Sequence, residues 1–153
     1  MPASGSLSHI DISVGSPDKA IPFYDALLSS LGYRRWVIDH PEWSGESPSR
    51  ATWGRRNSDG SRFDIEVRPA DPVLSDIRYN RYRPGPHHIA FHADSDSTVD
   101  AAYHAVHAAG GNILDPPRNY GGQPGYGKYY YAVFFADPDG FKIEVCYVPG
   151  ANP

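Results

Sequence analysis

Apolar and polar residues alternate near the beginning of the chain, and the pattern then changes to helical spacing. Every second residue from Ile10 to Val14 is apolar, which is typical of a strand with one buried face. Ser16-Pro17-Asp18 follows as a typical helix start, and apolar residues then recur at intervals of three and four until Gly32. We therefore predict a strand over residues 7–14 and a helix that ends just before this glycine.

The same strand and helix pattern returns in the second half of the chain. A strand is predicted over residues 88–93, followed by a polar helix start at residues 94–97 and a glycine stop at Gly110-Gly111. Three strand-like stretches follow each helix. They cover residues 33–39, 50–55 and 62–68 in the first copy and residues 112–114, 129–136 and 141–148 in the second.

Each half is thus predicted to be a βαβββ module. The modules cover residues 7–68 and 87–148, with a linker over residues 69–86, and a chain of 153 residues fits one domain that contains both. Tight turns are expected at Asn57–Gly60 and Asp137–Gly140. Residues 116–127 are rich in proline and glycine and predict a long loop, either a lid or an irregular surface segment.

A histidine opens each copy and a glutamate closes it. His9 precedes Glu66 by 57 positions, and His88 precedes Glu144 by 56. Strand alternation directs all four side chains to the polar face of their strands. Imidazole and carboxylate groups suit a divalent ion of borderline or moderate hardness, so we predict these four residues as metal ligands. For Glu66 the alternative is an ion pair with Arg62 or Arg68.

Other polar residues near these positions have open roles. His87 is a second choice to His88 as a ligand, because only His88 matches His9 in the repeat. His92, Asp11 and Asp64 can serve as a base, support a ligand or simply be hydrated. Histidines 40, 104 and 107 are expected in a loop or on the surface of the second helix.

Composition excludes several classes of protein. The chain carries 14 Lys and Arg against 18 Asp and Glu, a net charge of -4, and has no basic run that favours nucleic acid. No leader-like segment or apolar window of about 18 residues is present, so we expect a cytoplasmic protein without a membrane partner. Cys146 is the single cysteine, which excludes an internal disulfide.

The order His9, Glu66, His88, Glu144 on duplicated modules, together with the segment Ala136–Glu144, resembles the vicinal oxygen chelate superfamily. That group includes glyoxalase I, bleomycin and fosfomycin resistance proteins and extradiol dioxygenases. The resemblance implies an α+β fold in which two βαβββ modules form a cupped mixed sheet around a metal site. It also implies one divalent ion, which can be Ni, Zn, Mn, Co or Fe.

Position by position, His9, His88 and Glu144 match the ligands shared by metal-dependent members, and Glu66 matches the additional carboxylate of glyoxalase I-like enzymes. This resemblance favours a lyase or isomerase that acts on a small oxygenated molecule by metal-stabilised proton abstraction. Glu144 or Glu66 would be the catalytic base. A homodimer is expected, because small members commonly pair.

Three alternatives remain within the same resemblance. One is an extradiol dioxygenase, although no histidine lies between Pro41 and Pro86 to match the one expected before the second ligand. Another is a bleomycin-type binder without metal, and a third is a fosfomycin-type thiol transferase, for which Lys142 and Arg68 alone do not establish a phosphonate site. The aromatic groove of such a binder would draw on Trp36, Trp43, Trp53 and Tyr126–Tyr131.

Overall fold

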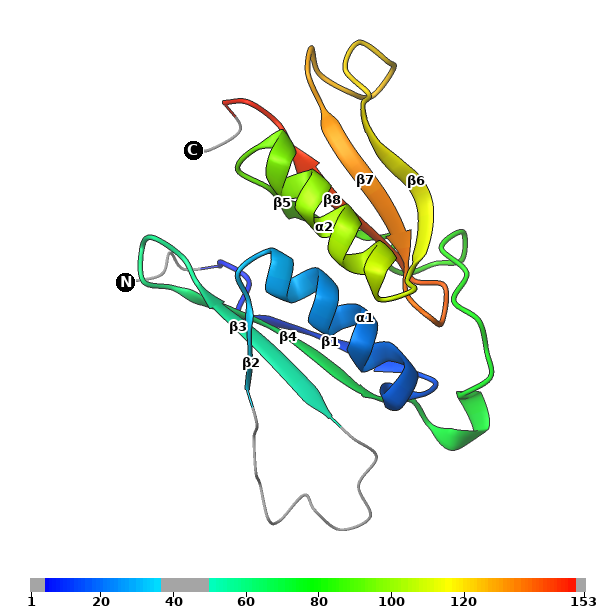
Figure 1. Cartoon of the computed structure of the whole chain (residues 1–153). Helices are drawn as coiled ribbons and strands as arrows, with labels where there is room; N and C mark the ends of the chain where they lie inside the picture. Colours follow the sequence, from blue (N-terminus) through cyan, green and yellow to red (C-terminus); the bar gives the residue numbers. More distant parts are fainter. Residues whose placement is uncertain (1–4, 37–49, 151–153) are drawn as a thin grey trace. The chain divides into compact units, whose positions relative to one another are not determined.

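A computed structural model of the chain describes residues 5–36 and 50–150 (Figure 1). Contacts divide the chain into two compact units, Met1–Ile77 and Arg78–Pro153. Over these described residues, each unit contains one α-helix and one four-stranded mixed sheet, as expected for duplicated βαβββ modules. Among the described residues, neither helix combines the length and the hydropathy that a membrane span needs.

In the first unit, the sheet has the strand order β1-β4-β3-β2. Strand β1 is parallel to β4, whereas the other pairs are antiparallel, and helix α1 connects β1 to β2 and lies along one face of the sheet (Figure 1). The predicted strand over residues 33–39 is described only to residue 36. The elements are β1 (His9–Val14), α1 (Pro17–Ser30), β2 (Arg34–Trp36), β3 (Ala51–Arg56) and β4 (Arg62–Pro69).

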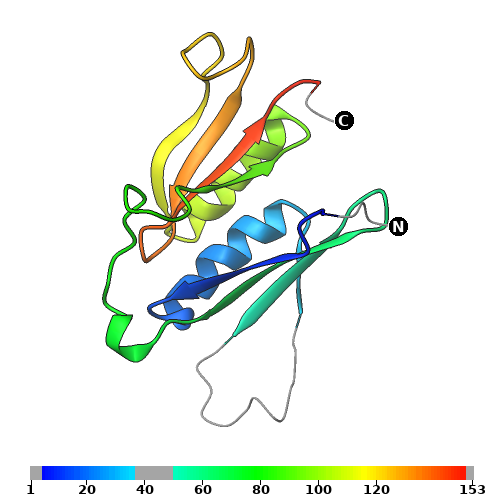
Figure 2. The same cartoon turned by 180° about the vertical axis from the view of Figure 1, so that it is seen from behind.

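The second unit repeats this topology with the order β5-β8-β7-β6. Figure 2 shows β5 running beside β8, which is the one parallel pair of this sheet. The elements are β5 (Ile89–His92), α2 (Asp96–Ala108), β6 (Asn112–Asn119), β7 (Tyr131–Ala136) and β8 (Lys142–Tyr147).

Each unit has its own apolar core between the helix and one face of the sheet. Leu27 and Leu28 of α1 are buried with Ile65 of β4, and Val106 of α2 is buried with Ile143 of β8. Burying one such side chain fully contributes roughly 1.5–3 kcal/mol. The predicted alternation along the strands is confirmed, because the polar residues of β1 and β4 are the more exposed ones. The face away from the helix is therefore free to carry chemistry.

The ends of the two helices follow the signals in the sequence. Pro17 begins α1 directly after Ser16, and Gly32 takes a φ of 80° just beyond the helix, a conformation that glycine adopts without strain. In α2, the Ser95 side chain accepts a hydrogen bond from the Thr98 backbone N–H. These residues fix where each helix begins and where α1 ends.

Strand β6 is longer than predicted and passes through Pro116 and Pro117. Because β6 is an edge strand, it needs no backbone donor on its open side, and proline is tolerated there. Its pairing with β7 shifts register after Ile113 and again after Asp115. The prediction of a loop over residues 116–127 was therefore wrong at its start. Beyond the strand, hydrogen bonds from Tyr120 N to Tyr130 O and from Gly122 N to Gly127 O continue the hairpin, both at 2.8 Å.

Residues of the predicted linker contribute to both units. A short 3-10 helix, Pro72–Leu74, belongs to the first unit. Residues from Arg78 onward contact the β7–β8 turn, since Tyr79 N donates to Asp139 O at 2.9 Å and Arg78 Nη1 donates to Pro138 O at 2.9 Å. The boundary between the units thus falls inside the linker.

Candidate functional site

His88 and Glu144 lie together on the polar face of the second sheet. Ala90 of β5 is the register neighbour of Glu144 in β8, and His88 precedes Ala90 by two residues, so both side chains share one face. His88 Nε2 is 3.1 Å from Glu144 Oε2. Glu144 is only 3% exposed. One imidazole nitrogen and one buried carboxylate oxygen in this arrangement fit the donor set of a divalent ion.

A tyrosine holds the other oxygen of this carboxylate. The Tyr130 hydroxyl donates to Glu144 Oε1 at 2.6 Å. Burial raises the pKa of Tyr130 well above its ordinary value, and contacts with Cys146 and Glu144 raise it further. The phenol therefore stays protonated and acts as a hydrogen-bond donor to the carboxylate.

The role of Tyr130 was not predicted from the sequence, where Tyr126–Tyr131 entered only as groove-lining residues of the binder alternative. A usable signal was the strand alternation, because consecutive residues point to opposite faces. Tyr129 donates to Asp96 of α2 at 2.5 Å, and Tyr131 donates to Asp100 at 2.9 Å. Only the side chain between them lies near Glu144, so these residues do not form one continuous wall.

An aromatic cluster surrounds Tyr130 on the polar face. The Tyr126 and Tyr130 rings lie 4.8 Å apart, and Tyr126 lies 5.5 Å from Tyr120. Tyr120 in turn packs edge-on against Phe134 of β7 at 5.4 Å. Tyr120 and Phe134 are each only 4% exposed, so this cluster shields one side of the Glu144 carboxylate.

Trp53 does not line a groove as expected for a drug binder. It is fully buried, packs against Tyr24 of α1, and donates through Nε1 to Asp25 at 2.8 Å. The reason is strand parity, which places Trp53 on the helix side of β3 together with the core. The side chain of Trp36, and all of Trp43, lie outside the described residues.

His87, the second choice as a ligand, lies directly beside His88. The two Nδ1 atoms are 2.7 Å apart, and the rings meet edge to face with centroids 5.0 Å apart. Lost solvation, followed by nearby His88, Lys142 and Arg81, lowers the pKa of His87. With its Nδ1 engaged in this way, His88 directs Nε2 toward Glu144, as a metal-binding histidine with a second hydrogen-bond partner does.

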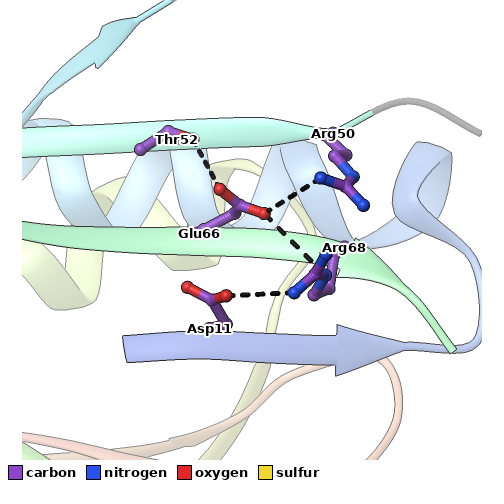
Figure 3. Close-up of polar contacts among 5 residues, drawn as sticks. All are labelled: Asp11, Arg50, Thr52, Glu66 and Arg68. Atoms are coloured by element: carbon purple, nitrogen blue, oxygen red, sulfur yellow. Dashed lines mark hydrogen bonds and ion pairs between the residues drawn. The ribbon is translucent and has the colours of Figure 1, made fainter. Parts of the chain in front are cut away.

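Glu66 has a different environment in the first unit (Figure 3). Thr52 Oγ1 donates to Glu66 Oε2 at 3.3 Å, and Oε1 lies 3.8 Å from Arg50 Nη1 and 3.9 Å from Arg68 Nε. Arg68 also donates through Nη1 to Asp11 Oδ2 at 3.1 Å. The ion pair with Arg68 considered from the sequence is therefore confirmed.

These cations oppose a metal ion at Glu66. Two like unit charges about 4 Å apart repel each other by about 1 kcal/mol in bulk water and by about 4 kcal/mol near a protein surface. Each arginine beside Glu66 therefore disfavours a metal ion bound there. Arg50 and Arg68 are each more than a third exposed, so the lower part of that range applies to them. Glu66 therefore fits a metal ion less well than Glu144 does.

The remaining polar candidates lie at the surface. His9 is exposed, on the same face of β1 as Asp11, and its Nδ1 is 3.3 Å from Ser8 Oγ. Arg62 pairs with Asp64 at 2.6 Å. His92 is exposed at the end of β5. His104 and His107 are exposed on α2 as expected, and His40 lies outside the described residues.

Over residues 5–36 and 50–150, no three His, Cys, Asp or Glu side chains gather in a group that could hold a metal ion. Within a single unit, the structure brings together His88 and Glu144. The four-ligand set of His9, Glu66, His88 and Glu144 stays a prediction.

The chain is similar in sequence and in structure to several known proteins. The chain is 30% identical over 140 residues to the uncharacterized protein YqjT of Bacillus subtilis strain 168, covering 91% of this chain and 96% of YqjT. A Bacillus halodurans protein provisionally named a glyoxalase has a solved structure that matches with a TM-score of 0.68 and 27% identity, over 95% of this chain and 97% of that one.

A glyoxalase/bleomycin resistance protein from Albidiferax ferrireducens T118 matches with a TM-score of 0.62 and 26% identity, over 93% of this chain and 98% of the other. Residues 6–145 match the family model of the Glyoxalase/Bleomycin resistance protein/Dioxygenase superfamily. This span includes the first module, all but the last three residues of the second, and all four predicted ligands. The chain therefore belongs to the glyoxalase/bleomycin resistance protein/dioxygenase superfamily.

Proposed function

We propose that this chain is a divalent-metal-dependent lyase or isomerase that acts on a small oxygenated molecule by proton abstraction. The observation that carries the proposal is the contact of 3.1 Å between His88 Nε2 and the buried Glu144 Oε2. A bound divalent ion supplies a Lewis acid that polarises a substrate oxygen and favours loss of a neighbouring proton. His9 is the further ligand that the sequence repeat predicts.

The residues around Glu144 suit it to proton transfer. Tyr130 fixes the carboxylate through Oε1, so that Oε2 is the oxygen directed toward His88. The aromatic cluster shields the carboxylate from water, which strengthens its polar interactions. In this role, Glu144 accepts the proton from the substrate and returns it to the adjacent carbon.

Metal analysis tests the proposal most directly. Protein purified without chelator is expected to carry about one divalent ion per chain, and His88→Ala and Glu144→Gln are expected to lose most of it. His107→Ala is the matched control, because His107 is exposed on α2 and contacts only Tyr103 among the aromatic rings that are described. Equal metal content in His88→Ala and His107→Ala would contradict the proposal that His88 and Glu144 bind the metal ion together.

A metal-dependent dioxygenase is the second candidate function. The Tyr130 hydroxyl beside Glu144 and the His87 ring beside His88 favour it, since they supply groups for acid-base steps next to the predicted ligands. Oxygen uptake with a catechol and Fe(II), together with no isomerisation of a hemithioacetal, would favour this function over proton transfer.

Two other expectations from the sequence, a homodimer and a cytoplasmic location, are also proposals. Sedimentation equilibrium of the full chain tests the first, because a dimer doubles the monomer mass of 16.9 kDa. A mass that stays at the monomer value across the concentration range would contradict it.

A further inference from the structure

The hydroxyl of Tyr120 is a buried polar group without a hydrogen-bond partner. Tyr120 is 4% exposed, and its hydroxyl finds no partner among residues 5–36 and 50–150. Burial raises the pKa of this phenol, so the hydroxyl keeps its proton and remains a donor. Nearly all buried polar groups in folded proteins are paired, so an unpaired hydroxyl at this place calls for a physical explanation.

Arg118 does not supply what the Tyr120 hydroxyl lacks. Its guanidinium lies over the face of the Tyr120 ring, with Cζ 4.4 Å from the ring centroid. Arginine carries N–H donors and no acceptor atom. A contact from Arg118 to the phenol oxygen would therefore still leave the Tyr120 proton without a partner. The missing partner is an acceptor, such as a carbonyl or carboxylate oxygen.

The ring of Tyr126 packs against this phenol from the loop between β6 and β7. Its centroid lies 5.5 Å from that of Tyr120 and 4.8 Å from that of Tyr130. The loop reaches beyond α2 in both views (Figures 1 and 2). Within residues 122–127, Tyr126 is the one residue that is not exposed. Its side chain can therefore turn toward solvent while the buried residues beneath it stay in place.

From these observations we infer that Tyr126 closes a binding site for an aromatic ligand that carries an oxygen acceptor. When the Tyr126 ring turns out, a flat ring of the ligand takes its place and an oxygen of the ligand accepts the hydrogen bond of Tyr120. As a binding site, this inference is independent of the metal. As a statement that the substrate is an oxygen-bearing aromatic compound, it rests on the proposed function.

The place that Tyr126 occupies lies next to the candidate catalytic carboxylate. Tyr130 packs against Tyr126 and donates to Glu144 Oε1 at 2.6 Å, so a ligand ring in this place would contact the phenol that orients Glu144. Phe134, the register neighbour of Glu144 on β7, packs edge-on against Tyr120 at 5.4 Å. Aromatic walls favour a flat ring, and a single convergent donor favours a ring with an acceptor.

Tyr120→Phe tests whether the hydroxyl is unpaired in the free protein. Removing an unpaired buried hydroxyl relieves its desolvation penalty, so the urea midpoint of this variant is expected to rise. Tyr131→Phe is the matched control, because its hydroxyl donates to Asp100 at 2.9 Å and the same change should lower the midpoint. A midpoint that does not rise in Tyr120→Phe would show that the hydroxyl is already bonded, for example to a buried water, and would overturn the inference.

Ligand titration of the full chain tests the site itself. Acetophenone supplies a ring with a carbonyl acceptor, and toluene supplies the ring alone. Both are titrated while the backbone amide signals of Gly122 and Gly125 are followed by NMR. Saturable binding of acetophenone is expected, with its dissociation constant raised about tenfold in Tyr120→Phe and that of toluene unchanged. Tyr126→Ala should bind both probes more tightly, because the site no longer has to open.

Three results of this titration would contradict the inference. They are wild-type protein that shows no saturable binding of acetophenone, a loss of affinity in Tyr120→Phe that is equal for the two probes or is matched in Tyr131→Phe, and weaker binding in Tyr126→Ala. Failure of the proposed function is distinct from these results. It would appear as unchanged metal content in His88→Ala, with the binding of acetophenone and its dependence on Tyr120 intact.

Discussion

Replacing Tyr130 by Phe isolates one hydrogen bond to the candidate catalytic carboxylate. The change removes the hydroxyl that lies 2.6 Å from Glu144 Oε1 and leaves the aromatic ring in its cluster. Glu144 is 3% exposed, so water cannot easily replace the lost donor. Hydrogen bonds to charged groups contribute about 1.5–3 kcal/mol, and we expect the free energy of unfolding to fall by about that amount.

The same substitution should weaken metal binding. A residue that orients a ligand typically changes metal affinity by about 10- to 100-fold when it is removed. Tyr131→Phe is the control, because Tyr131 donates to Asp100 of α2 and not to Glu144. Titration of the chelator-treated protein with Zn²⁺ measures the affinity, and urea denaturation of the same samples measures stability.

The pH dependence gives a third measurement for the same variant. Burial and hydrogen bonding raise the pKa of Tyr130 above its ordinary value of 10.0. When folding raises a pKa, the stabilisation from that group is fully present at pH values below its pKa in the unfolded chain. It is lost as the pH rises through the pKa of the folded protein. The loss of stability in Tyr130→Phe should therefore be equal at about pH 7 and about pH 9. An unchanged metal affinity together with full stability would refute the reasoning.

Three further predictions concern the second unit. Burial raises the pKa of the Cys146 thiol, which is 4% exposed, so iodoacetamide should label it in urea but hardly at all in the folded protein, as mass spectrometry would show. Tyr131 has a pKa raised to about 12 by burial and by Asp100, so stability should fall as pH rises from about 10 to about 12, and Tyr131→Phe should remove that part of the slope in urea titrations. Gly140 has a φ of 93° in the β7–β8 turn, so Gly140→Ala should cost about 1 kcal/mol or more, and an unchanged melting temperature would contradict this.

Much of the fold could be predicted because its signals are local. The alternation from Ile10 to Val14 and the stop at Gly32 depend only on neighbouring residues, and the structure has β1 and α1 there. The repeat then predicts the second unit from the first. Strand β6 was predicted too short, because Pro116 and Pro117 normally end a strand, and only the sheet order shows that this strand lies at an edge.

The candidate site was less predictable, because equivalent positions can have different neighbours. Strand parity directed Glu66 and Glu144 to the polar faces of their sheets, as the structure shows. The sequence repeat could not show that Tyr130 donates to Glu144 while Arg50 lies beside Glu66. These contacts depend on side chains from the β6–β7 hairpin and from the residue directly before β3, and their conformations are set by packing.

The paired prolines of β6 also bear on whether its open edge can recruit another chain. An edge strand with a full row of backbone donors is a template on which another chain can add a strand, and such additions can propagate into fibres. Consecutive residues of a strand direct their N–H groups to opposite sides, so the adjacent Pro116 and Pro117 remove one donor from the open edge, and the register shifts around them bend the strand. Replacing both by valine should therefore create an edge that recruits other molecules, with little change in the contacts that hold the folded monomer together.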